Sequence, residues 1–277
     1  MTVAVDHDGM RRSLLPTLYS LLLPGLAAPC QAETRPDVGF IQTPEPVVRA
    51  MLEVADTAPG DRVLDLGSGD GRIPIMAAVE FGAEGRGIEI DGQLVKLSRQ
   101  RAEAAGVGEA VQFEQGDLFE ADLSGADIIT LYLLPELNQR LKPSLLSLPS
   151  GTRIVSHEFD MGRWQADDYR AVNQRKIYFW RVPAAVAGEW RASRQGKEIK
   201  LRLEQNYQRV WGEAELDGLI TDLRDVRLDG DTLRFRIRTE ASQRVMRARF
   251  RHGRLIELQS APPLSGFSPA SQWKVAD

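Results

Sequence analysis

Residues 63–75 read VLDLGSGDGRIPI, a short apolar run followed by a turn with three glycines in five positions. The apolar run predicts a strand that is buried on both faces. Gly67, Gly69 and Gly71 allow positive φ and let a ligand come close to the main chain. A buried strand, a glycine turn and a helix in succession therefore indicate a cofactor site at the end of this strand.

Strand and helix patterns alternate on both sides of the glycine turn. Strands are expected near residues 62–66, 85–90, 111–113, 126–133 and 152–156, and helices near residues 43–52, 75–79, 93–104 and 135–148. Thr43 and Pro44 are expected to begin the first helix, with the Thr43 hydroxyl as its cap. The alternation predicts an α/β fold, a Rossmann-like parallel sheet with helices on both faces.

Acidic residues follow the second and third predicted strands. Glu89 lies 22 residues after Gly67, a spacing typical of a carboxylate that binds ribose hydroxyls in Rossmann-like sites. Asp117 follows the third strand, where a carboxylate could accept a hydrogen bond from an adenine amino group. Arg72 stands where the G-x-G-x-x-G fingerprint has its third glycine, which disfavours a dinucleotide. Each feature alone could be a tight turn or a solvated cap, but together they favour a nucleoside site.

These residues carry a resemblance to a known family. Residues 65–72 (DLGSGDGR), Glu89 and residues 117–118 (DL) resemble the class I S-adenosylmethionine (SAM)-dependent methyltransferases. Residues 40–44 (FIQTP) and 130–138 (TLYLLPELN) resemble the branch that includes the ATP-synthase c-subunit lysine methyltransferases and archaeal protein lysine methyltransferases. The likeness covers residues 38–180. Gln42 replaces a proline of that branch, which puts the rigidity of its segment in doubt.

The resemblance implies that SAM is the cofactor and that one set of residues contacts it. The set is Thr43, Asp65, Gly67, Ser68, Gly69, Glu89, Asp117 and Leu118. By resemblance, Asp65 and Gly67 lie near the methionine part, and Thr43 closes over its carboxylate. Glu89 holds the ribose, and Asp117 with the Leu118 amide reads the adenine.

Methyl transfer requires few catalytic groups, because it is an in-line displacement whose rate depends on alignment and on the exclusion of water. A lysine acceptor must be neutral, and apolar surroundings such as residues 131–134 (LYLL) lower the pKa of an amine. Tyr132 and Asn138 are candidates for substrate positioning; the alternatives are a packed strand end and a helix-surface residue. His157 could be a base or a structural histidine.

The expected substrate is a protein. No Asn/Asp-Pro-Pro-aromatic motif follows the fourth strand, which disfavours nucleic-acid bases as acceptors. Three histidines and one cysteine, scattered along the chain, predict no metal site. A second interpretation stays open: an exported protein that binds SAM, S-adenosylhomocysteine (SAH) or another small molecule on this scaffold without catalysis, because a fold alone does not fix a function.

Residues 10–32 have the pattern of an export signal. A basic start at residues 10–12 precedes an apolar run at residues 14–23 and a small-x-small site, which predicts cleavage after Ala32. The run is shorter than the ~20 residues of a membrane span and contains Pro16 and Pro24. The mature protein is therefore expected in the periplasm or otherwise exported, without a membrane span; a cytoplasmic or membrane-anchored location is the alternative. The sequence carries no signal for an oligomeric state.

The C-terminal third changes period. Residues 181–277 carry 18 Lys and Arg against 13 Asp and Glu, a net charge of +5 in a chain whose total is −4. Apolar and charged residues alternate, and turn signals at residues 229–231 (DGD) and 252–254 (HGR) predict hairpins. We predict a small antiparallel meander or partly closed barrel over residues 184–256 with a loose tail. Its arginine stripes favour a solvated face over an acidic or nucleic-acid partner.

Three domains are thus expected: a signal peptide at residues 1–32, a SAM-binding domain at 33–183 and a β-rich accessory domain at 184–277.

Overall fold

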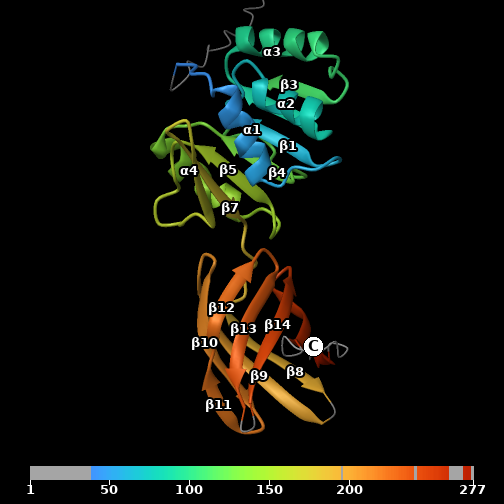
Figure 1. Cartoon of the computed structure of the whole chain (residues 1–277), viewed down its shortest axis with the longest axis vertical. Helices are drawn as coiled ribbons and strands as arrows, with labels where there is room; N and C mark the ends of the chain where they lie inside the picture. Colours follow the sequence, from blue (N-terminus) through green and yellow to red (C-terminus); the bar gives the residue numbers. More distant parts are fainter. Residues whose placement is uncertain (1–38, 195, 240–241, 262–270, 276–277) are drawn as a thin grey trace, which may run out of the picture. The chain divides into compact units, whose positions relative to one another are not determined.

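The computed structural model describes residues 39–194, 196–239, 242–261 and 271–275 (Figure 1). The predicted signal peptide lies outside the described residues, and the three predicted domain limits stay predictions. In the part of the chain that is described, none of the helices combines the length and the apolar character that crossing a membrane requires.

Seven strands form the first sheet, in the order β3-β2-β1-β4-β5-β7-β6. They are β1 (Arg62–Leu66), β2 (Glu84–Glu89), β3 (Val111–Gln115), β4 (Ile128–Leu131), β5 (Arg153–His157), β6 (Asp168–Val172) and β7 (Arg175–Arg181). The first five are parallel, as predicted. This parallel arrangement follows from the buried apolar runs of the central strands, which need cover on both faces.

The last two strands correct the prediction of a purely parallel sheet. β7 pairs antiparallel with β5, and β6 pairs antiparallel with β7. The β6–β7 hairpin was not predicted, because its turn contains no glycine: Asn173 and Gln174 adopt positive φ of 50° and 65° instead. β6 is also exposed along four of its five residues, so it has no alternating pattern.

Four helices cover both faces of this sheet. They are α1 (Glu45–Val54), α2 (Arg72–Phe81), α3 (Gly92–Ala104) and α4 (Pro135–Leu146). Val63 of β1 belongs to the core that contains α1 and α2, whereas its neighbour Leu64 belongs to the core that contains α4. Successive residues of β1 therefore serve opposite faces, as the pleat of a strand requires. The prediction of helices on both faces is confirmed.

Nine strands form the second sheet, in the order β11-β10-β9-β8-β16-β15-β14-β13-β12. They are β8 (Gly188–Arg194), β9 (Lys197–Asn206), β10 (Arg209–Leu216), β11 (Leu219–Asp222), β12 (Arg224–Asp229), β13 (Thr232–Arg238), β14 (Gln243–Arg251), β15 (Arg254–Ala261) and β16 (Ser271–Val275). All described pairings in it are antiparallel. The hairpins predicted at residues 229–231 and 252–254 are confirmed as β12–β13 and β14–β15. The predicted loose tail is wrong where β15 continues to Ala261 and β16 adds a strand.

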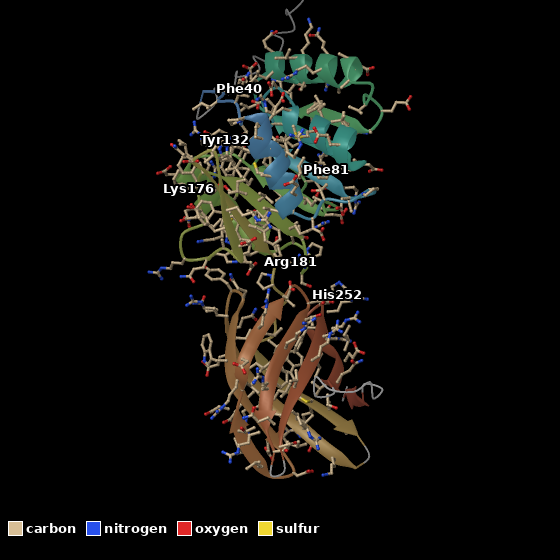
Figure 2. All side chains as sticks on the ribbon, in the orientation of Figure 1. Phe40, Phe81, Tyr132, Lys176, Arg181 and His252 are labelled. Carbon is tan, nitrogen blue, oxygen red and sulfur yellow. The ribbon has the colours of Figure 1, made fainter. Side chains whose placement is uncertain are left out.

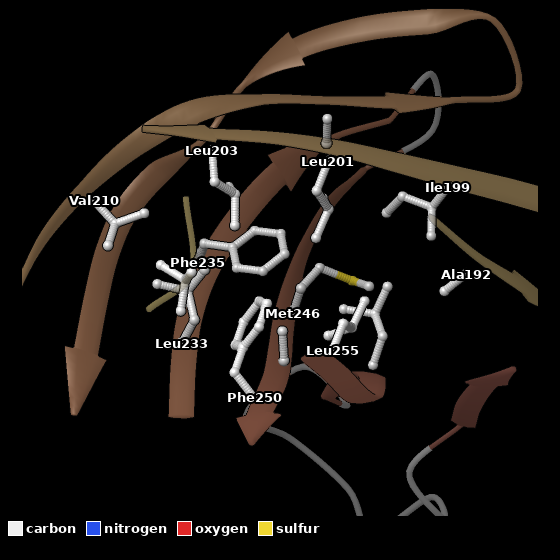
Figure 3. Close-up of a cluster of buried hydrophobic side chains, with 14 of the residues drawn as sticks. Ala192, Ile199, Leu201, Leu203, Val210, Leu233, Phe235, Met246, Phe250 and Leu255 are labelled. Carbon is white, nitrogen blue, oxygen red and sulfur yellow. The ribbon is translucent and has the colours of Figure 1, made fainter. Parts of the chain in front are cut away.

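The two halves of the second sheet share one core (Figure 3). Leu201 of β9 lies in the same buried cluster as Phe235 of β13 and Phe250 of β14. The intervening charged residues of β13 are exposed, which confirms the predicted period of two. Burial of one face is what fixes this alternation.

Candidate functional site

The candidate site lies at the carboxyl ends of the parallel strands. β1 is the middle one of the five parallel strands, with β2 and β3 on one side and β4 and β5 on the other. The chain adds strands outward from β1 to β3 and then returns to the other side of β1 for β4 and β5; in open α/β sheets ligands bind at such a switch point, beyond the carboxyl ends of the strands.

The glycine turn adopts the predicted left-handed conformation. Gly67, Gly69 and Gly71 have φ values of 77°, 54° and 78°. The amides of Gly67 and Ser68 both donate to the carbonyl of Ile88, each at 2.9 Å, which ties the turn to β2. Ser68 Oγ is buried and has no hydrogen-bond partner among the described residues.

Glu89 ends β2 and faces the glycine turn. Its side chain is almost fully buried, and Oε2 accepts from the amide of Gly69 at 2.8 Å while Oε1 accepts from the amide of Asp91 at 3.0 Å. A carboxylate has about four lone-pair positions. Two positions therefore remain for further donors, such as the two hydroxyls of a ribose.

Asp65 is buried at the end of β1. Thr130 Oγ1 donates to its Oδ1 at 2.7 Å. Burial, together with the smaller effect of the charges of Glu89 and Asp70, raises the pKa of Asp65 to about 7, and the hydrogen bond from Thr130 opposes this shift. Near neutral pH the carboxyl group is thus balanced between its two protonation states.

Asp117 and Leu118 lie in the turn after β3, next to Glu89. The amide of Gly116 donates to the backbone carbonyl of Glu89 at 2.9 Å, so this turn and the end of β2 are joined. Asp117 Oδ1 accepts from the amide of Phe119 at 2.9 Å. Asp117 and Leu118 are both partly exposed, and a ligand can therefore reach them.

The segment before α1 covers the glycine turn. Phe40 lies on this segment (Figure 2), and a Cβ added at Gly69 would clash with Cε2 of the Phe40 ring, so the ring lies directly against this glycine. Thr43 is buried, and its predicted cap is wrong: the cap residue is Pro44, with no side-chain hydrogen bond. The hydroxyl of Thr43 instead forms a hydrogen bond with a residue that lies 114 positions further along the chain.

That residue is His157, at the end of β5. Thr43 Oγ1 and His157 Nδ1 share a hydrogen bond of 3.1 Å, in which either atom can donate depending on the tautomer. The Tyr132 ring, which follows β4, lies 4.0 Å from the His157 ring between centroids. His157 is fully buried, and its Nε2 has no hydrogen-bond partner in the described chain. Three sequence-predicted residues thus meet at one point.

Burial lowers the pKa of His157 to about 4, and it outweighs the opposing charge of Glu158. We expect ¹³Cε1 NMR signals of His157, assigned with a His157→Asn variant, to remain those of a neutral ring down to about pH 5. The unfolded chain takes up this proton near pH 6.5. The contribution of His157 to stability is therefore complete above pH 6.5 and is lost as the pH falls through about 4. A titration midpoint at or above pH 6 would contradict this.

Asn138 is fully buried in α4, so its interpretation as a helix-surface residue is wrong. Its Nδ2 lies 3.3 Å from the carbonyl oxygen of Phe159 and 3.4 Å from that of Asp160, both in the loop after β5. Its Oδ1 has no partner among the described residues. Substrate positioning by Asn138 stays a prediction. Its hydrogen bonds indicate that Asn138 would act indirectly, by fixing the loop after β5.

Asp70 was not predicted as a site residue, and Arg72 was predicted only as a departure from the dinucleotide fingerprint. Arg72 Nε and Nη2 donate to Asp70 at 2.9 and 2.6 Å, and Arg72 Nη1 donates to the carbonyl of Thr43 at 2.8 Å. Burial would raise the pKa of Asp70, but Arg72 and Arg101 outweigh it and lower the pKa. The spacing of two positions between Asp70 and Arg72 was the feature of the sequence from which this pair could have been predicted. The pair connects the glycine turn to the covering segment.

A pocket of about 500 Å³ lies at the opposite, amino end of β1 and β2. Its arginines are already paired: Arg62 with Asp127 at 3.3 Å and Arg86 with Glu114 at 2.8 Å. Ser68 Oγ and His157 Nε2, which are buried without a partner, and Asp65 and His157, which have large pKa shifts, lie at the carboxyl end, which makes that end the better candidate despite the volume. Within the described ranges, no cluster of His, Cys, Asp and Glu could hold a metal ion.

The comparisons with known proteins match this chain to methyltransferases. Residues 65–168 match the family model of the ANTKMT methyltransferase domain. The chain is 43% identical over 131 residues to a protein-lysine N-methyltransferase of Saccharolobus islandicus, which covers 47% of this chain and 81% of that protein. It is 34% identical over 152 residues to the mouse adenine nucleotide translocase lysine N-methyltransferase, with 54% and 64% covered.

A solved structure is similar to about half of the chain. It is described as an RNA methyltransferase from Salinibacter ruber in complex with SAH. The sequence identity is 53% and the TM-score 0.52, and the match covers 53% of this chain and 96% of that one.

Proposed function

The chain belongs to the class I SAM-dependent methyltransferase family that includes the archaeal protein-lysine N-methyltransferase, and on this premise we propose that it transfers a methyl group from SAM to a lysine side chain of a protein. The observation that carries the proposal is the buried Glu89 carboxylate, which faces the glycine turn with two acceptor positions free. Families share chemistry more reliably than folds do, so membership favours an enzyme over a binding protein without catalysis.

The residues present are suited to SAM. Glu89 would hold the ribose hydroxyls, Asp117 and the Leu118 amide would contact the adenine, and Gly67 and Gly69 would admit the ligand to the backbone. Ser68 Oγ, which is buried and unpartnered in the described chain, provides a further polar group at the turn. When bound, SAM supplies a methyl group on a positively charged sulfur.

Asp65 and Thr43 are assigned to the methionine end. We expect the affinity for SAM to rise about tenfold between pH 6 and pH 8, because a cationic ligand favours the ionised form of a carboxyl group whose pKa is about 7. Isothermal titration calorimetry of the full chain measures this. Asp65→Asn should remove the pH dependence of the affinity. If the affinity of this variant rises with pH as steeply as that of the unmodified chain, another group is responsible.

The acceptor amine is assigned to the surroundings of Tyr132. Leu131 and Leu133 on either side of it are buried, and apolar surroundings lower the pKa of an amine and so favour its nucleophilic form. His157 supports this role because a neutral imidazole adds no positive charge that would repel an ammonium group. Asn138 would act as a positioning residue through the loop after β5.

A second candidate substrate is RNA, which the description of the Salinibacter ruber relative favours. The sequence after β4, LYLLP at residues 131–135, lacks the Asn/Asp-Pro-Pro-aromatic motif of base amino-methylation. Protein lysine therefore remains the first proposal.

The deciding experiment incubates the purified chain with methyl-labelled SAM and cell extract, divided into protease-treated and RNase-treated portions. Label that protease removes, followed by detection of methyl-lysine by mass spectrometry, supports the proposal. Label that RNase removes selects RNA instead. Binding of SAH without transfer to either fraction would support a binding protein. The Glu89→Gln variant serves as the negative control.

A further inference from the structure

Strand register places three arginines in a row on the second sheet. Arg227 of β12 lies opposite Arg234 of β13, and Arg234 lies opposite Arg247 of β14. Directly opposed residues of antiparallel strands share a face. All three side chains are exposed, and among the described residues no carboxylate lies within salt-bridge distance of any of them. We call these three residues the arginine row.

In the other half of the same sheet, opposite charges face each other across neighbouring strands. Arg202 of β9 lies between Glu189 of β8 and Glu213 of β10, with which it forms hydrogen bonds of 3.2 and 2.7 Å. Lys200 pairs with Glu215 at 3.2 Å in the same way. Opposite charges across strands stabilise a sheet, and like charges directly opposite destabilise it. The arginine row therefore opposes folding stability, and a role outside folding explains it better.

The row belongs to a wider basic face. Residues 224–254 contain ten arginines and no lysine, against four acidic residues. Arg236 and Arg249, which flank the row, pair with Asp225 at 3.0 Å and Glu257 at 3.4 Å, whereas the arginines of the row have no such carboxylate among the described residues. Arginine suits phosphate oxygens because its planar guanidinium can bind two of them at once.

We propose that this face binds the surface of a bilayer that contains anionic phospholipids. Neighbouring strands are about 4.8 Å apart, so the three guanidinium groups of the row are close enough together to contact the phosphates of neighbouring headgroups. Val245 lies opposite Arg236 on the same face and is exposed. Arginine beside exposed aliphatic residues is favoured at membrane interfaces.

Nucleic acid is the less favoured partner of this face. The aromatic residues of β13 and β14, Phe235 and Phe250, are buried in the core, and β12 has none, so the three strands that carry the row present no ring on which a base could stack.

The test is co-sedimentation of the full chain with vesicles of phosphatidylcholine alone or with 30 mol% phosphatidylglycerol. We expect binding to the anionic vesicles that weakens with salt. An Arg227→Gln/Arg234→Gln/Arg247→Gln variant should reduce the partition coefficient about 100-fold, since each basic residue near an anionic surface contributes about a factor of five. The matched control, Lys197→Gln/Lys200→Gln/Arg202→Gln, removes the same charge from the other half and should retain most binding.

Equal loss in both triple variants would overturn the proposal, because net charge alone would then explain binding. Equal binding to neutral and anionic vesicles would overturn it too, as would tighter binding of the row to duplex RNA than to anionic vesicles. The melting temperature of the row variant should be unchanged or higher, since like-charge repulsion is removed. A lower melting temperature with unchanged vesicle binding would show that the row is structural. Methyl transfer is not part of this test, so the result is independent of the proposed function.

Discussion

Glu89→Gln is expected to weaken binding of SAH by about 10- to 100-fold, with little change in the fold. The substitution removes a charge that would accept the ribose hydroxyls, and hydrogen bonds to a charged group contribute about 1.5–3 kcal/mol each. Gln is preferable to Ala because Glu89 also accepts from the amides of Gly69 and Asp91. Gln keeps one oxygen, which can accept from one of these two amides, whereas its NH2 group cannot accept from the other.

Isothermal titration calorimetry with SAH measures the effect, and thermal melting checks the fold. Glu84→Gln, at the exposed amino end of the same strand, is the matched control and should leave the affinity unchanged. Unchanged affinity in Glu89→Gln would show that the ribose does not bind here. A collapse in melting temperature would instead show that Glu89 is needed for the fold of the glycine turn.

Gly71→Ala is expected to lower the free energy of unfolding by about 2–5 kcal/mol. Gly71 precedes α2 with φ of 78°, and a non-glycine residue in the left-handed region costs about 1–2 kcal/mol. An added Cβ would also lie 2.5 Å from Cβ of Ser98 and 2.6 Å from Cζ of Phe113. Overpacking of this kind costs about 1–3 kcal/mol.

Gly60→Ala separates the two causes, because Gly60 has φ of 87° and nothing within 4 Å of an added Cβ. Urea denaturation should show a loss of about 1–2 kcal/mol in this control. Equal losses in the two variants would mean that contact with Ser98 and Phe113 does not matter, and that backbone conformation alone requires glycine at position 71.

Much of the site could be predicted because it depends on short segments. The glycine turn follows from a buried strand and residues that allow positive φ, and Gly67, Gly69 and Gly71 do adopt it. Glu89 could be found from its spacing, since parallel strands end at one edge of the sheet. The β6–β7 hairpin could not be found in this way, because Asn173 and Gln174 take the conformation that glycine normally marks.

The chain's sequence alone determined the order of the first five strands and of the four helices between and before them, because apolar periodicity and glycine act over a few neighbouring positions. Only the tertiary structure decided which distant side chains meet. Thr43 and His157 are 114 residues apart, and their hydrogen bond depends on how the segment before α1 packs over β5. The arginine row likewise depends on register, since a shift of one residue between β12 and β13 would move Arg227 away from Arg234. Register is set by the burial of the whole apolar face. This burial depends on several strands together, so it cannot be read from any one segment.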